Sequence, residues 1–250
     1  VDEEIPHIPV AAEGLDKNDL AVISTTNWQP YTWSVNNVAL AEIMHTALAY
    51  WQGGQANKAF QLWESGLVES MYLGASPGAL EQLLYYDAIR GELYRDFADP
   101  VGMTARSLVE GLFGILPNAI ENKLILRPGF PSTWDTASIE IPDISLKFER
   151  NKNIDTYHIR PNFMKKMPLE FIINANTDQL HKITVNQKDV SWKLVDDAVG
   201  IPQIMIEIPY SDAYVIQLEW RGNPLEKPRL SAPIFSEEKI QIQTEKATIL

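Results

Sequence analysis

The spacing of hydrophobic residues along the chain changes once, near residue 120. Before that point, apolar side chains recur at steps of three and four residues, which is the period of a helix with one buried face. After it, apolar residues come in short alternating or continuous runs bounded by turn residues, as in β-strands. The pattern therefore predicts a helical first part and a β-rich second part.

Four helices are predicted in the first part, over residues 40–51, 56–71, 77–88 and 104–116. Gly53 and Gly54 make a tight turn after the first helix, so the first two helices should form an antiparallel hairpin. Thr104 can cap the last helix, and Gly114 with Pro117 should end it. The expected buried face of that last helix comprises Ala105, Leu108, Val109, Leu112 and Leu116.

Eight strand-like runs follow, which is typical of an antiparallel β-sandwich. They cover residues 123–127, 138–141, 144–148, 156–160, 169–174, 182–185, 204–208 and 214–220. We expect four segments in all: an irregular lead-in (1–26), helical hairpins (27–120), the sandwich (121–221) and an extended tail (222–250).

Composition excludes several classes of partner and site. The chain has 33 acidic and 21 basic residues, a net charge of −12, and no Lys/Arg cluster, so nucleic acid is not expected as a partner. Without cysteine there are no disulfides, thiolate metal sites or cysteine nucleophiles. No apolar run approaches the roughly 18 to 20 residues that span a bilayer, so no membrane partner is expected.

A cluster of aromatic and amide side chains at residues 27–37 is the first candidate binding site. Its sequence, NWQPYTWSVNN, combines rings that can pack on the C–H face of a sugar with amides that can bond to its hydroxyl groups. The same rings could instead close the end of a helical core, since large aromatics are usually buried. The candidate sugar-binding residues are Trp28, Tyr31, Trp33 and Asn36.

Other site chemistry is not supported by the motifs. The four histidines, His45 among them, have no metal-ligand spacing, and no cofactor motif is present, so no metal or cofactor is predicted. Residues 74–78 match the pattern of a nucleophilic serine turn, but Pro77 follows Ser76 and has no N–H for the oxyanion hole. Ser76 is better interpreted as a helix cap.

The stretch from Asp99 to Trp134 gives a resemblance to a known family. Helical hairpins, an acidic loop, GLFGILP and LILRPGFPSTWDTASI leading into β-like runs resemble the C-terminal end of the (α/α)6-barrel glycoside hydrolases, the six-hairpin glycosidases that include inverting α-L-fucosidases and α-L-rhamnosidases. The resemblance covers about residues 27–150. It implies an α+β multidomain fold, in which a partial (α/α)6 helical-hairpin toroid is followed by an antiparallel β-sandwich.

The resemblance also implies a catalytic base. Asp99 in DPVGMTA matches the aspartate of the family's loop, although this loop is one residue shorter and has Pro100 in place of glycine. Asp96 and Glu92 are the alternative bases. Independently of the family, Asp99 before Pro100 is also a common helix start, and the two roles are compatible.

An inverting hydrolase needs a protonated carboxyl group and a carboxylate about 6.5 to 9.5 Å apart, with water between. The family's acid lies in a barrel of twelve helices, of which this sequence predicts four, so we expect the C-terminal portion of a longer glycoside hydrolase. Its expected partners are a carbohydrate substrate and the remaining N-terminal part or another copy of the chain. The portion by itself should be inactive.

The resemblance further implies a secreted, polysaccharide-degrading protein, periplasmic or extracellular, with any export signal outside the sequence given. Glycoside phosphorylases share the architecture, so phosphorolysis stays open. The alternatives from other classes are a non-catalytic carbohydrate-binding module and a structural assembly module.

Overall fold

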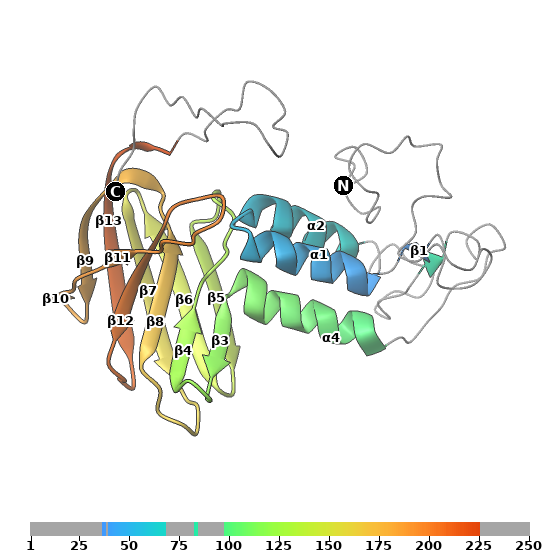
Figure 1. Ribbon diagram of the computed structural model, residues 1–250, viewed down its shortest axis with the longest axis horizontal. Coiled ribbons are helices and arrows are strands. Elements are labelled where there is room, and N and C mark those ends of the chain that lie inside the picture. Colours follow the sequence, from blue (N-terminus) through green and yellow to red (C-terminus); the bar gives the residue numbers. More distant parts are fainter. Residues whose placement is uncertain (1–36, 39, 69–82, 85–97, 226–250) are drawn as a thin grey trace, which may run out of the picture. The chain divides into compact units, whose positions relative to one another are not determined.

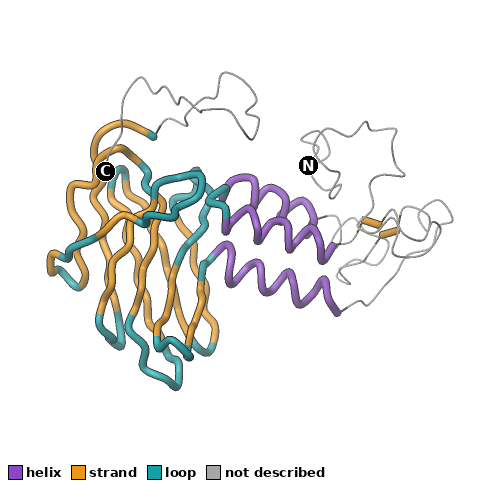
Figure 2. The backbone as a smooth tube through the Cα atoms, in the orientation of Figure 1, coloured by secondary structure: helices purple, strands orange, loops and turns teal. Residues whose placement is uncertain are grey.

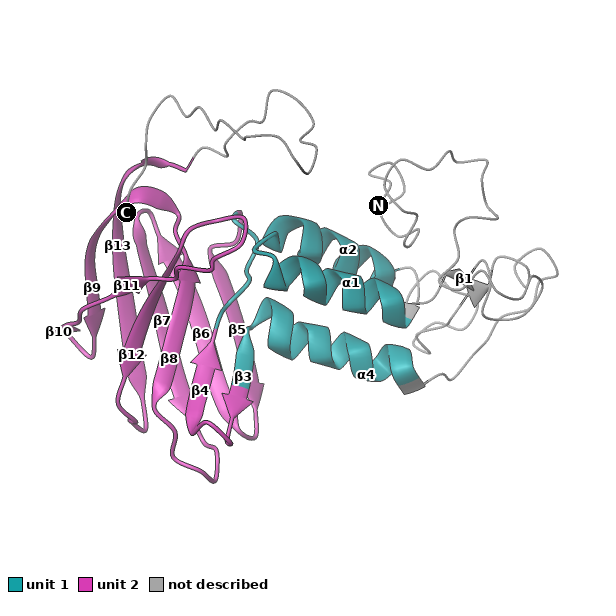
Figure 3. Ribbon diagram, in the orientation of Figure 1, with its two compact units in different colours: residues 1–116, 127–132 teal, residues 117–126, 133–250 magenta. Residues whose placement is uncertain are grey.

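The computed structural model describes residues 37–38, 40–68, 83–84 and 98–225 (Figure 1). Contacts between Cα atoms divide the chain into two compact units, coloured separately in Figure 3. The first, here called the helical unit, contains residues 1–116 and 127–132. The second, the two-sheet unit, contains residues 117–126 and 133–250.

The helical unit is built around its first helix, which contacts the other helices of the unit. Leu83–Leu84 and Asn37–Val38 also pair as a short antiparallel ladder, β2 with β1. The helices are α1 (Leu40–Gln52), α2 (Ala56–Val68), α4 (Ala98–Arg106) and the π-helix η3 (Ser107–Leu112), which continues α4.

The first two predicted helices are confirmed. Met44 and Ala47 of α1 and Ala59 of α2 are fully buried, as the three- and four-residue spacing requires. After α1 the chain turns at Gly54, whose φ of 71° lies in the left-handed region that favours glycine.

The other two helical predictions are partly wrong. Leu83 and Leu84, placed in a third helix, form strand β2, because a short apolar pair fits either period. The last helix begins six residues before Thr104, whose hydroxyl donates to the Pro100 carbonyl at 2.7 Å instead of capping. Its end before Gly114 is confirmed, with Gly114 at φ 65°.

The buried face of the last helix also differs from the predicted one. Ala105 is exposed. Ser107 and Gly111, which are not part of the predicted face, are buried, Ser107 fully. A π-helix has more residues per turn than an α-helix, so the stretch from Ser107 to Leu112 shifts the phase of the apolar pattern. The backbone N–H of Phe113 donates to the Leu108 carbonyl at 3.0 Å, which closes this wider turn.

Two tryptophans join α1 and α2 to the rest of the helical unit. The indole N–H of Trp51 donates to the Gly129 carbonyl at 2.8 Å, and that of Trp63 donates to the Ser107 hydroxyl at 3.0 Å. A Cβ atom at Gly111 or Gly129 would overlap the Trp51 ring. Both positions therefore require glycine while Trp51 keeps this place.

The two-sheet unit contains a six-stranded sheet in the order β10-β9-β13-β7-β6-β5 and a five-stranded sheet in the order β11-β12-β8-β4-β3 (Figures 1 and 2). All eight predicted strand runs are confirmed, with ends shifted by a few residues. The strands are β3 (Ile115–Asn118), β4 (Lys123–Leu126), β5 (Thr136–Ile141), β6 (Ile144–Asn151), β7 (Ile154–Pro161), β8 (Leu169–Asn174), β9 (Thr177–Val185), β10 (Lys188–Asp189), β11 (Lys193–Leu194), β12 (Gln203–Ile208) and β13 (Tyr214–Pro224).

The inner faces of the two sheets share one apolar core. In β6 and β7 buried and solvent-facing residues alternate, as expected for strands with one face on a core. Tyr157 of β7 lies between Phe148 of β6 and Phe171 of β8. The centroid of its ring is 5.0 Å from that of Phe148 and 4.9 Å from that of Phe171. Within this unit β4 and β8 run parallel, whereas β5, β6, β7, β13 and β9 pair in an antiparallel sense, as do β11, β12 and β8.

The predicted fold class, a partial (α/α)6 helical-hairpin toroid followed by an antiparallel β-sandwich, is wrong. The described residues hold three short α-helices and two larger, mostly antiparallel sheets, so this part of the chain is mainly β. The helical hairpin itself is present, but α1 fills the centre of a small cluster. A hairpin is a local motif, and its hydrophobic period does not specify the larger arrangement that it joins.

Candidate functional site

Of the residues predicted to act in catalysis or sugar binding, Asp99 alone lies within the described residues. It occupies the first turn of α4 and is exposed. Its role as a base, as a helix-start residue or both stays a prediction. Asp96, Glu92, Trp28, Tyr31, Trp33 and Asn36 lie outside the described residues.

A different candidate site lies on the outer face of the six-stranded sheet. There a shallow hollow of about 470 Å³ crosses strands β5, β6, β7 and β13. Its volume falls within the range of small-molecule sites, about 300 to 1,000 Å³. The lining side chains that point away from the core are those of Ser138, Glu140, Ser145, Lys147, His158, Arg160 and Val215.

Strand register sets these side chains in two rows. In the first row, here called the lower row, Ser138, Lys147 and His158 lie opposite one another across β5, β6 and β7. In the second, the upper row, Glu140, Ser145 and Arg160 lie opposite one another across the same strands. Facing residues on neighbouring strands are about 5 Å apart at Cβ, and the two rows are about 7 Å apart along the strands. Six polar side chains therefore share one small surface.

The lower row is partly held by an ion pair at its border. Lys147 Nζ lies 2.9 Å from Glu149 Oε1, and His158 Nε2 lies 3.9 Å from Glu149 Oε2. The hydrogen bond from Lys147 lowers the pKa of Glu149, and the charges of Lys147 and His158 add to that effect. Glu149 itself does not line the hollow. Lys147 and His158 therefore both face a carboxylate just outside the hollow.

The upper row contrasts with this arrangement. Within the described part of the chain, the side chains of Glu140, Ser145 and Arg160 form no hydrogen bond or ion pair. Ser138, at the end of the lower row, is likewise without a partner there. An unpaired guanidinium, carboxylate and two hydroxyls offer both donors and acceptors to a ligand.

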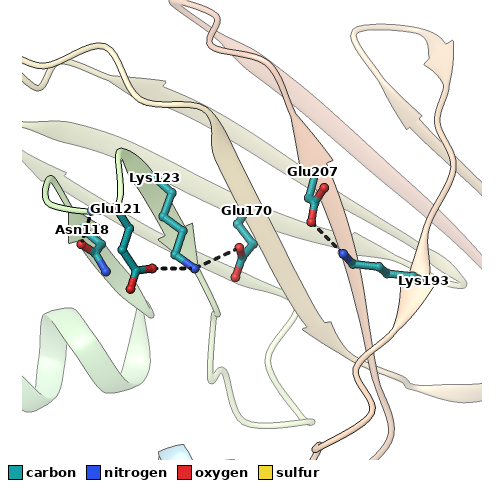
Figure 4. A network of polar contacts seen from close by, with 6 residues as sticks. All are labelled: Asn118, Glu121, Lys123, Glu170, Lys193 and Glu207. Atoms are coloured by element: carbon teal, nitrogen blue, oxygen red, sulfur yellow. Dashed lines mark hydrogen bonds and ion pairs between the residues drawn. The ribbon is translucent and has the colours of Figure 1, made fainter.

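The outer face of the five-stranded sheet shows the opposite behaviour (Figure 4). Lys123 Nζ lies 3.1 Å from Glu121 and 3.5 Å from Glu170, and Lys193 lies 2.7 Å from Glu207. The Glu121 hydrogen bond and the Glu170 charge raise the pKa of Lys123. Surface charges are thus paired across this sheet, whereas those of the hollow's upper row are not.

A buried ionic cluster supports the strands that carry the hollow. Asp155 of β7 is fully buried and accepts hydrogen bonds from Arg150 at 2.6 and 3.0 Å. Asn176 and the Trp220 indole donate to the same carboxylate at 2.8 and 3.0 Å. Burial lowers the pKa of Arg150, but the hydrogen bond and charge of Asp155 outweigh it and raise the pKa overall. With its carboxylate satisfied by four donors, Asp155 has a structural role.

The hydrophobic pattern places most of the lining residues on predicted strands but does not identify them as a site. His158 is exposed. Alternation along β6 and β7 could have put Lys147, His158 and Arg160 on an outward face. Their neighbours across the sheet depend on strand order and register, which the sequence does not reveal.

No group of three or more His, Cys, Asp or Glu side chains that could hold a metal ion occurs among the described residues. In the same part of the chain, no helix has the length and apolar character needed to cross a membrane.

No family model matches this chain, and no match is found among curated proteins. Among solved structures, an α-L-rhamnosidase from Dictyoglumus thermophilum is similar, with 13% sequence identity and a TM-score of 0.47. The match covers 72% of this chain and 20% of that one, so this chain spans about a fifth of that protein's length.

Proposed function

We propose that this chain binds carbohydrate in the hollow of its six-stranded sheet and does not cleave glycosidic bonds by itself. One observation carries the proposal: hydroxyl, carboxylate, imidazole, ammonium and guanidinium groups together line a hollow of about 470 Å³. A sugar offers many hydroxyl groups that each donate and accept hydrogen bonds, so its recognition requires such a mixture. Val215 adds an aliphatic contact for the sugar's C–H groups.

The lining residues favour binding over hydrolysis. Inverting hydrolysis requires two carboxyl groups, one of them protonated, about 6.5 to 9.5 Å apart. Among the residues that line the hollow, Glu140 is the single carboxylate. The hollow is also shallow, so it does not supply the partial burial that keeps a catalytic acid protonated. Binding without chemistry is what this set of side chains can do.

In the whole protein, we propose that this binding serves a glycoside hydrolase of the inverting type. Support comes from the resemblance of residues 99–134 to such enzymes, with Asp99 as the proposed base. The hollow would then hold a sugar chain while other residues of the protein supply the acid.

The test is a calorimetric titration of the full chain with a panel of neutral and acidic oligosaccharides. Ser145→Trp places a large ring in the hollow and should abolish binding while the circular dichroism spectrum stays unchanged. The matched control is Thr184→Trp. Thr184 lies on β9, on the same outer face of the six-stranded sheet but outside the hollow, so this variant should bind normally. If no oligosaccharide binds, or if both variants bind like the unmodified chain, the proposal is wrong.

A further inference from the structure

The lining of the hollow carries two cations, Lys147 and Arg160, and one carboxylate, Glu140. These cations lie on a chain whose net charge is −12. What each of them can offer a ligand depends on its local partners.

Lys147 and Arg160 differ in what they can still bind. Lys147 is paired with Glu149 at 2.9 Å. Arg160 is exposed, and its guanidinium contacts no acceptor within the described residues. Ser145 lies directly opposite Arg160 in the register, and His158 lies two residues along the same strand. Arg160 therefore has a hydroxyl and an imidazole among its neighbours on the outer face.

These three side chains suit a carboxylate. A guanidinium presents planar N–H groups that match the two oxygens of a carboxylate, and such charge-assisted bonds are stronger than neutral ones. The Ser145 hydroxyl and the His158 imidazole can each donate one further hydrogen bond. Glu140 lies beyond Ser145 in the same row, about 10 Å from Arg160 across two strand spacings. It can accept hydrogen bonds from hydroxyls but repels a second carboxylate.

We propose that Arg160, Ser145 and His158 form a subsite for the carboxylate of an acidic sugar, a hexuronic acid residue, with the hydroxyls of the ligand directed toward Glu140. This inference rests on the proposed function and narrows it to one class of glycan. The row from Arg160 to Glu140 sets the direction of the ligand, acid group at β7 and neutral hydroxyls at β5.

The experiment compares four ligands by calorimetry on the full chain: trigalacturonic acid, its methyl ester, the matching neutral trisaccharide and a sulfated trisaccharide of equal charge. Loss of a charge-assisted hydrogen bond should weaken binding about tenfold or more. We expect the acid to bind at least about tenfold more tightly than the ester, the neutral sugar and the sulfate ester.

Variants locate the effect. Arg160→Gln should remove the preference for the acid over its ester, and Arg160→Lys should restore part of it, because lysine keeps the charge but not the planar donor pair. Lys188→Gln, an exposed cation of β10 outside the hollow, is the matched control and should keep the full preference. Adding salt should weaken the acid's binding and leave the ester's unchanged.

Equal affinity for acid and ester overturns the inference, as does an equal loss in Arg160→Gln and Lys188→Gln. Equal affinity for the sulfated ligand also overturns it, since the site would then select charge and not a carboxylate. If the neutral sugar binds as tightly as the acid and Ser145→Trp abolishes it, the proposed function stands and this inference fails. If none of the four binds, this inference fails, and the wider oligosaccharide panel decides the proposed function separately.

Discussion

Asp155 and Arg150 form a two-point ion pair inside the two-sheet unit, with Nε to Oδ1 at 2.6 Å and Nη2 to Oδ2 at 3.0 Å. The Asp155 side chain is buried, and Asn176 and Trp220 also donate to it. Asp155→Ala leaves these donors and the half-buried guanidinium without their acceptor. We expect a loss of about 3 to 5 kcal/mol in the free energy of unfolding, measured by urea titration.

Lys193→Ala is the control for that substitution, because Lys193 forms an ion pair of similar length with Glu207 but on the exposed outer face. Exposed pairs contribute little to stability, so its unfolding curve should nearly overlay that of the unmodified chain. Equal losses in the two variants would contradict the importance given to burial.

Gly111→Ala should destabilise the helical unit. An added Cβ atom would overlap the ring of Trp51, whose indole is fixed by its hydrogen bond to Gly129. Overpacking of this kind costs about 1 to 3 kcal/mol. The measurement is thermal unfolding of the full chain, followed by the helical circular dichroism signal.

Gly102→Ala is the matched control for this substitution. Gly102 is also helical, in α4, but nothing lies within 4 Å of an added Cβ atom. Replacing glycine by alanine in an open helix position should leave stability unchanged or raise it by about 0.5 to 1 kcal/mol. If both alanine variants gained stability, the proposed packing of Trp51 on Gly111 would be wrong.

The ionisation of Tyr157 should make the stability of the two-sheet unit depend on alkaline pH. Burial, and next the charge of Asp155, raise the pKa of Tyr157 well above its ordinary value. A raised pKa in the folded state means that its contribution to stability is complete below the pKa of the unfolded chain, about 10, and is lost as the pH rises above it. The urea concentration at the unfolding midpoint should therefore decrease as the pH is raised above about 10.

Tyr157→Phe removes the ionisable hydroxyl and keeps the ring contacts with Phe148 and Phe171. Its urea midpoint should fall less steeply with alkaline pH than that of the unmodified chain. Identical slopes in the two proteins would show that Tyr157 does not determine the alkaline response.

Local patterns allowed many of the helices and strands, but not the fold class, to be predicted from sequence. The apolar stripe of α1 and the alternation in β6 and β7 each report a period that is set by neighbouring residues. The π-turn at Ser107–Leu112 could not be foreseen, since its effect is a shift of phase within a segment that still looks helical. Leu83–Leu84 was ambiguous because two apolar residues fit both a strand and a helix.

The candidate site depended on information that is not local. Ser145 and Arg160 are 15 positions apart and belong to different strands, and they meet because β6 and β7 pair in one register. A register shifted by one residue would turn one of them toward the core. The resemblance of residues 99–134 predicts a site at the carboxylates near Asp99. The hollow lies elsewhere, within the two-sheet unit.

Asp99 supplies the last prediction, which concerns catalysis. It is exposed in the first turn of α4, whereas an inverting hydrolase needs a second carboxyl group that partial burial keeps protonated. We therefore expect no turnover of 4-nitrophenyl fucoside or rhamnoside by the purified chain, and the same null result for Asp99→Asn. Glu64→Gln, at another exposed carboxylate of the helical unit, is the control. Turnover that Asp99→Asn abolishes and Glu64→Gln retains would instead make this chain a glycosidase in its own right.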